Sequence, residues 1–75
     1  MRPLFVSRHA LFRVRHREIS LAEVKAAIQK PDLVGSVKHG RLRVIKRCAG
    51  RDLVVIYKRL RHVNIVVTAY WREKC

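Results

Sequence analysis

The chain has 75 residues, and its hydrophobic fraction of 49% is ordinary for a globular protein. This length allows one compact domain over residues 1–75, with one small core and no room for a second domain or a deep cavity. The charge is unusual, because 18 Lys and Arg face five Asp and Glu and give a formal net charge of +13. Such a charge favours an anionic partner: nucleic acid, an anionic membrane surface or an acidic protein.

Several classes of protein are excluded by what the sequence lacks. No apolar run approaches the ~20 residues of a membrane span, and the start lacks the long apolar stretch of a signal peptide. Cys48 and Cys75 are too few for a disulfide framework and lack metal-ligand spacing. The few acidic residues are not clustered, which argues against a carboxylate-held Mg²⁺ site. We therefore expect a cytoplasmic protein with no membrane contact, no cofactor and no metal.

Residues 7–17 predict a short helix. Ser7 is a suitable N-cap, because its hydroxyl can accept a hydrogen bond from a backbone N–H that has no partner within the helix. At about 100° per residue, one apolar stripe forms on the helix; it consists of Ala10, Leu11 and Val14. The opposite side is polar and carries His9, Arg13, His16 and Arg17.

A second helix is predicted from Ser20 to Lys30. Ser20 and Glu23 have the spacing of a capping box, and Ile19 can pack on Val24 as a hydrophobic staple. The helix ends at Pro31, whose ring cannot continue it. Its expected core face consists of Leu21, Val24, Ala27 and Ile28.

After Pro31 the hydrophobic period changes from 3.6 to 2, which predicts four strands. Their ranges are 33–38, 41–48, 51–58 and 63–70. Ala49-Gly50 is a typical two-residue hairpin turn, and short connections favour antiparallel neighbours. The predicted fold class is therefore α+β, with two N-terminal helices packed on one face of a four-stranded antiparallel sheet.

Alternation along the strands sorts their side chains onto two faces, if Cys48 pairs with Arg51 and Val55 with Ile65. The face under the helices is expected to hold Leu42, Val44, Leu53, Val55, Tyr57, Val63, Ile65, Val67 and Ala69. The other face is expected to hold Arg41, Arg43, Arg47, Asp52, Lys58, His62, Asn64, Thr68 and Tyr70 around Ile45, Val54, Ile56 and Val66. An apolar floor with a basic rim suits a surface on which bases lie on the floor and phosphates meet cations. Lys46 falls on the core face and is expected to snorkel from the strand end or to mark a bulge.

Single aromatic and histidine residues carry less information. His9 lies one helical turn from Arg13, and an imidazole beside a cation is a candidate base. The alternative is a histidine that packs or caps at the helix start. Phe12 and Trp71 are expected to be anchors of the core or of an interface rather than platforms for base stacking.

Several runs of residues stand at recognisable spacings. Near the start these are Ser7-Arg8-His9-Ala10-Leu11-x-Arg13, Arg17-Glu18-Ile19-Ser20-x-x-Glu23-Val24 and Ile28-x-x-Pro31. In the strands they are Gly40-Arg41-x-x-Val44, Leu53-Val54-Val55-Ile56-Tyr57 and Ile65-Val66-Val67-Thr68-Ala69-Tyr70. Over nearly its whole length the chain thus resembles the domain-of-unknown-function 4258 family. That family looks related to BrnT-type toxins and, more remotely, to the RelE-like ribonucleases of toxin–antitoxin systems.

The resemblance implies a compact α+β domain that cuts RNA on the exposed face of its sheet. His9 and Arg13 match helix positions of the family, and Thr68 and Tyr70 match its final strand. RNA cleavage without a metal needs a base for the 2′-OH, cations for the phosphorane and an acid for the leaving oxygen. His9 is the candidate base, and Tyr70 or His62 the candidate acid. The candidate cations are Arg13, Arg43 and Arg47, and the wider RNA-binding set is Arg17, Arg41, Arg43, Arg47, Lys58 and Thr68.

The sequence therefore predicts a small toxin-like, RNA-directed domain that acts as a metal-independent endoribonuclease. The expected partners are RNA, an acidic antitoxin protein and a second copy of the chain. One alternative is a basic nucleic-acid-binding module without catalysis, which would not need His9. Another is an interaction protein whose charge matches an acidic partner.

Overall fold

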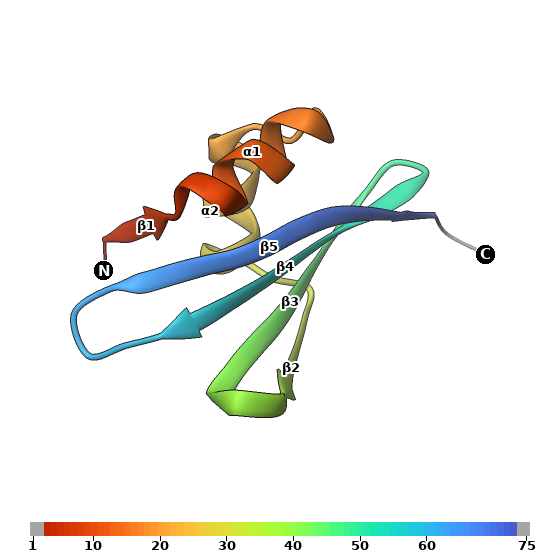
Figure 1. Ribbon diagram of the computed structural model, residues 1–75. Helices are drawn as coiled ribbons and strands as arrows, with labels where there is room; N and C mark the ends of the chain where they lie inside the picture. Colours follow the sequence, from red (N-terminus) through yellow and green to blue (C-terminus); the bar gives the residue numbers. More distant parts are fainter. Residues whose placement is uncertain (1–2, 74–75) are drawn as a thin grey trace.

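A computed structural model describes residues 3–73 and shows a five-stranded sheet with two helices on one side (Figure 1). In chain order the elements are β1 (Leu4–Val6), α1 (Arg8–His16), α2 (Leu21–Gln29), β2 (Leu33–Val37), the 3₁₀ turn η1 (Lys38–Gly40), β3 (Arg41–Cys48), β4 (Arg51–Arg59) and β5 (Asn64–Glu73). The strand order in the sheet is β1-β5-β4-β3-β2. All neighbours are antiparallel except β1 and β5, which run parallel.

The predicted four-stranded antiparallel sheet is wrong, because β1 adds a fifth strand in a parallel pair. Leu4 lies opposite Asn64 in that pair, and the N–H of Asn64 donates to the carbonyl of Pro3 at 3.0 Å. With only three residues, β1 is too short to show an alternation of its own. Its pairing joins the two ends of the chain, so no local turn signals it.

The two helices begin where the caps predict. The Ser7 hydroxyl accepts from the N–H of Ala10 at 3.2 Å, at the start of α1. Ser20 and Glu23 form the complete capping box of α2, with bonds of 3.0 and 2.9 Å. Each cap satisfies N–H groups that have no partner within the helix. Ile19, the residue before the second cap, is buried in the core.

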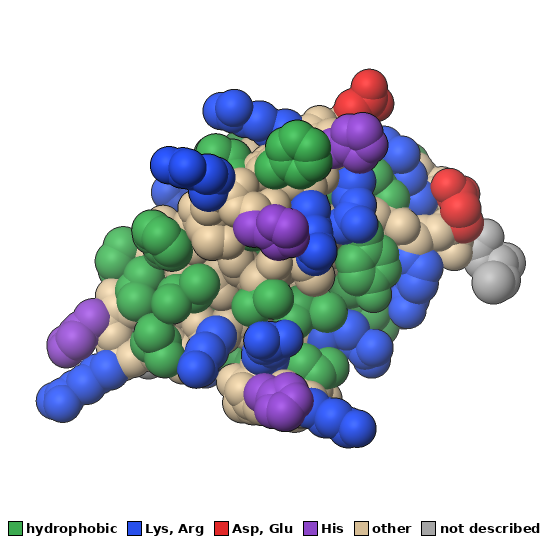
Figure 2. Space-filling view, viewed as in Figure 1, with side chains coloured by type: hydrophobic (Ala, Val, Ile, Leu, Met, Phe, Trp, Pro, Cys, Tyr) green, Lys and Arg blue, Asp and Glu red, His purple; other side chains and the backbone are tan. Residues whose placement is uncertain are grey.

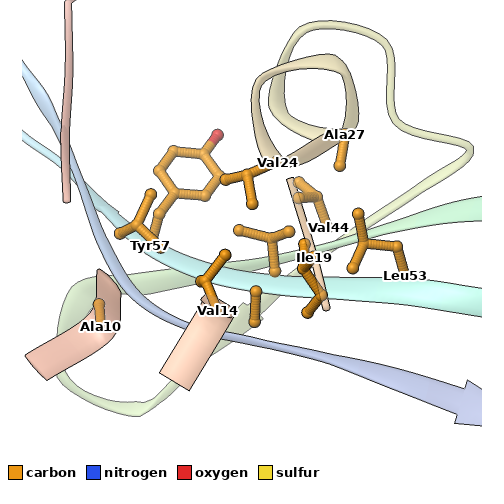
Figure 3. Packing of buried hydrophobic residues seen from close by; sticks show 11 residues of the cluster. Ala10, Val14, Ile19, Val24, Ala27, Val44, Leu53 and Tyr57 are labelled. Carbon is orange, nitrogen blue, oxygen red and sulfur yellow. The ribbon is translucent and has the colours of Figure 1, made fainter. Parts of the chain in front are cut away.

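The core lies between the helices and one face of the sheet (Figure 3). Both helices contribute small or β-branched side chains, and the strands contribute mostly Val with the larger Leu53 and Tyr57. The buried cluster consists of Ala10, Val14, Ile19, Val24, Ala27, Val44, Leu53, Val55, Tyr57, Val66 and Ala69. Small helix residues let the helices approach the sheet closely, so this short chain still encloses fully buried side chains.

A bulge in β5 changes the faces predicted for that strand. Val55 lies opposite Ala69 and not Ile65, and the register shifts between Ile56 and Tyr57, where the partners are Thr68 and Val66. Val67 is left without a partner, so Val66 joins Ala69 in the core. The assignment of Val66 to the exposed floor is therefore wrong, because an extra residue reverses the alternation beyond it.

The same bulge places other residues at the start of β5 on the face opposite to the predicted one. Asn64, predicted on the polar face, lies opposite Arg59 on the helix side and is buried. Ile65, predicted in the core, lies opposite Lys58 on the other face. The β3–β4 hairpin needs no such correction, since Cys48 lies opposite Arg51 as predicted.

The side chain of Lys46 extends out of the core toward the C-terminal end of α2. It belongs to the helix side of β3, and its Nζ donates to the carbonyl of Lys30 at 3.0 Å. Lys30 is the C-cap of α2, so an ammonium group lies at the negative end of the helix dipole. A cation on the core side of a strand is tolerated here because it finds this partner.

Candidate nucleic-acid interface

The face of the sheet opposite the helices, called the open face here, carries the predicted basic pattern. The strand registers place its residues in four rows across the sheet: Phe5–Ile65–Lys58–Arg41–Val37, Thr68–Ile56–Arg43–Gly35, Tyr70–Val54–Ile45–Leu33 and Arg72–Asp52–Arg47. The third row is largely apolar, Arg43 lies in the second row, and the other cations of the face lie in the first and last rows.

The middle of the open face is less accessible than the sequence pattern implies. Val54 is 0% exposed and Ile45 is buried, although α1 and α2 pack on the other side of the sheet. The side chains around them on the open face must therefore cover them. Bases cannot lie directly on these two residues; the aromatic rings of this face are those of half-buried Tyr70 and exposed Phe5.

The cations of the open face differ in how they are held. Arg72 forms an ion pair of 3.1 Å with the buried Asp52. The remaining cations of this face are exposed; they are Arg41, Arg43, Arg47 and Lys58. Asp52 and Arg72 are the only ion pair within residues 3–73, so most of the positive charge is not neutralised by the described part of the protein.

Arg17 links α1 to the free edge of β5. Because β1 pairs with β5 only from Asn64 to Val66, the outer edge of β5 beyond Val66 has no strand beside it. The Arg17 guanidinium lies at that edge, where it donates to the carbonyl of Ala69 at 2.8 Å and to Thr68 Oγ1 at 3.4 Å. A cation thus occupies an edge that could otherwise pair with another chain.

Trp71 fixes the same end of α1 on β5. Its indole N–H donates to the carbonyl of Arg17 at 3.1 Å, and the guanidinium of Arg51 lies 3.9 Å from its ring centre. Trp71 packs against the core, in agreement with its predicted role as an anchor. The position of Arg17 at the edge of β5 is therefore held by two separate contacts.

The four predicted catalytic residues are not brought into one cluster. His9 and Arg13 are exposed on α1, and Tyr70 is on the open face. His62 is exposed in the loop before β5. From Asn64 to Tyr70 is six residues of strand, or about 20 Å at ~3.3 Å per residue, so His62 and Tyr70 lie at opposite ends of β5. They cannot serve as alternative acids at the same place.

Phe12 is the main surface feature that sequence reasoning missed. Of its two predicted roles, as an anchor of the core or of an interface, the first is wrong, because Phe12 is 68% exposed. Its ring lies nearly parallel to that of His16, with an interplanar angle of 7° and 6.0 Å between centroids. The signal was present, because Phe12 and His16 are four residues apart and both lie away from the stripe formed by Ala10 and Val14.

Charge gathers where α1 lies over β5. Figure 2 shows Lys, Arg and histidine side chains together in that region, with few acidic ones on the same face. His9, Arg13 and Arg17 follow each other at four-residue spacing, so they share one side of α1. That side is the one from which Arg17 reaches β5. The surface of α1 and the open face therefore meet at the edge of β5.

Residues 6–71 match the model of a protein family that is described as a domain of unknown function, DUF4258. The chain belongs to this family. No curated protein and no solved structure matches it. Among residues 3–73 of this DUF4258 domain, no helix has the length and apolar character needed to cross a membrane. No three His, Cys, Asp or Glu side chains of the same residues are grouped as the ligands of a metal ion would be.

Proposed function

We propose that this DUF4258 domain binds single-stranded nucleic acid, with cytoplasmic RNA as its partner in the cell. The binding surface that we propose, called the basic surface below, consists of Arg17, Arg41, Arg43, Arg47 and Lys58. The observation that carries the proposal is the contact of Arg17 with Ala69 and Thr68, because it makes α1 continuous with the sheet. A strand of RNA can then follow cations from α1 over the edge of β5 to the open face.

Electrostatics supports this proposal over a purely structural role for the charge. Each cation that neutralises a phosphate releases condensed counterions, and this release drives binding. The exposed cations of the open face have no ion-pair partner within residues 3–73. Arg17 uses one guanidinium nitrogen at the edge of β5, and its other N–H donors leave it able to hold a phosphate oxygen as well.

The salt dependence of binding tests the proposal. Five phosphate contacts on a single strand give a log–log slope near −3.5, at ~0.7 per contact. Arg43→Gln should reduce the slope by about 0.7 and weaken binding. Lys25→Gln removes the same charge from an exposed position on α2 and should leave the slope nearly unchanged. Fluorescence anisotropy with a labelled oligonucleotide measures both; a slope near zero, or equal effects of the two variants, would refute the basic surface.

RNA cleavage is a second candidate function, and the arrangement of α1 favours it. His9, Arg13 and Arg17 lie along one side of the helix, and Arg17 contacts Thr68. His9 lies about two helical turns, or ~12 Å, from Arg17, so RNA that extends from Arg17 along this side of α1 would reach it. A relation of the DUF4258 family to BrnT-type and RelE-like toxins would point the same way, and an acidic antitoxin would then be the natural partner of the basic surface.

The chemistry would use the RNA's own hydroxyl. His9 would take the proton of a 2′-OH, whose oxygen would attack the adjacent phosphorus and form a 2′,3′-cyclic phosphate. Arg13 would stabilise the crowded phosphorane, and the bond to the 5′-oxygen would break as that oxygen takes up a proton. Tyr70 can supply the proton only if the RNA bends round the edge of β5, because Tyr70 is on the open face.

Cleavage is tested by incubating mixed RNA with the protein in the presence of EDTA and measuring the rate at which the RNA is cut. Loss of a general base costs ~10²–10⁴ in rate, so His9→Ala should nearly abolish cleavage while oligonucleotide binding remains. His39→Asn is the control, since His39 is in η1 with a φ of 67°, a conformation that Asn tolerates. Melting curves of both variants exclude unfolding. Cleavage by His9→Ala at the wild-type rate would remove His9 from the mechanism, and absence of cleavage by the wild type would leave the binding function alone.

A further inference from the structure

The outer surface of α1 is unusual because it exposes an aromatic pair among cations. Phe12 and His16 stack there, and a shallow hollow of about 480 Å³ lies beside them. The residues that line the hollow are Arg8, Leu11, Phe12, Arg15 and His16. Figure 2 shows hydrophobic, histidine and basic side chains close together over this helix. We propose that this hollow is a nucleobase-binding site, in which a base stacks on the Phe12–His16 pair and its phosphates contact Arg8 and Arg15.

Exposure of Phe12 has no structural explanation in the fold. At 68% exposed the ring contributes little burial, whereas Ala10 and Val14 hold α1 on the sheet. An apolar surface rimmed by polar groups is typical of an interaction site, and Phe12 lines one hollow together with half-buried Leu11, Arg8 and Arg15. The near-parallel rings of Phe12 and His16 mean that a planar base laid on one ring is also parallel to the other.

The surroundings of the pair select a nucleic acid over an apolar partner. Arg8 and Arg15 both line the hollow, both are exposed, and neither forms an ion pair with any residue of the described part of the chain. The helix has no acidic residue in its first turn. Single-strand binders combine cations along the backbone with aromatic rings under the bases, and α1 presents both within about two turns.

The hollow supplies a pair of stacked rings, which the open face lacks. Val54 and Ile45 are buried on that face, and its aromatic residues Phe5 and Tyr70 lie in different rows of the sheet and not beside each other. Stacking on α1 and phosphate binding on the basic surface would be two parts of one path for a single strand. The inference therefore rests on the proposed function, and it adds that the protein contacts bases as well as the backbone.

The experiment compares two single-stranded DNA oligonucleotides of equal length, one with bases and one built from abasic spacers. Stacking of one base contributes ~1–3 kcal/mol, which corresponds to about a 5- to 150-fold change in affinity. Phe12→Ala should weaken binding of the first oligonucleotide by that factor and leave the second unchanged. Phe12→Tyr keeps the ring and should bind both as the wild type does.

The outcomes separate this inference from the proposed function. The salt slope of Phe12→Ala should equal that of the wild type, because no charge is lost. If the wild type binds with the expected slope but Phe12→Ala binds the base-bearing oligonucleotide equally well, the base site is refuted and the basic surface stands. Equal weakening of both oligonucleotides would also refute stacking. Loss of self-association in Phe12→Ala, with unchanged binding of both oligonucleotides, would assign the hollow to a protein contact instead. If the wild type binds neither oligonucleotide at low salt, both proposals fail.

Discussion

Replacement of Val66 and Val67 by alanine distinguishes the observed register of β5 from simple alternation. Alternation from Ala69 places Val67 in the core and Val66 on the open face. The bulge instead places Val66, at 0% exposed, among the core residues and leaves Val67 half-buried and without a partner on β4. The two variants delete the same atoms from adjacent positions, so their difference reports burial alone.

The expected magnitudes follow from that burial. Val66→Ala removes two methyl groups from a closed site, which costs ~1.6 kcal/mol of transfer free energy and about 2–3 kcal/mol once the cavity is included. At ~4–8 °C per kcal/mol for a domain of this size, its melting temperature should fall by about 10–20 °C. Val67→Ala should cost less than about 1 kcal/mol. Circular dichroism melts measure both, and an equal or larger fall for Val67→Ala would refute the bulge.

Three further changes test local parts of the fold. Ser20→Ala removes one half of the α2 capping box and should lower the free energy of unfolding by about 1 kcal/mol, read from urea titration; no loss would mean that the cap contributes nothing. Gly50→Ala meets no neighbouring atom but has a φ of +80°, so the backbone alone should cost it about 1 kcal/mol, and an unchanged melting temperature would contradict the turn geometry. Arg17→Ala leaves the Ala69 carbonyl at the edge of β5 without this donor, and should increase self-association measured by light scattering. Scattering equal to that of the wild type would show that Arg17 does not prevent pairing at this edge.

Local signals were sufficient for the helices and for the central hairpin. The caps at Ser7 and Ser20 act through residues three positions away, so the sequence itself contains the whole interaction. The β3–β4 hairpin is set by its two-residue turn, and its register follows directly. Features of this kind depend on neighbours in sequence, and pattern reasoning finds them.

The errors in the sheet concern interactions between residues that are distant in sequence. β1 is recognisable only through β5, about 60 residues later. The bulge at Val67 lies next to the segment of β5 that pairs with both β4 and β1. Nothing in the apolar run from Ile65 to Val67 indicates which residue has no partner on β4. Because each residue faces the side opposite to that of its neighbours, this one insertion moved Asn64, Ile65 and Val66 to the wrong faces.

The candidate site shows the same division. The basic residues predicted on the open face from β3 and β4 lie there as alternation predicts, since no bulge interrupts those strands; they are Arg41, Arg43, Arg47 and Lys58. The contact of Arg17 with the edge of β5 could not be predicted, because it depends on where α1 ends above β5 and on how far β1 extends along that edge. Arg17 also shows why charge and structure are not separate here. The Arg17 guanidinium occupies the edge of β5 and lies between the cations of α1 and those of the sheet. The same contact therefore blocks pairing at this edge and makes the proposed basic surface continuous.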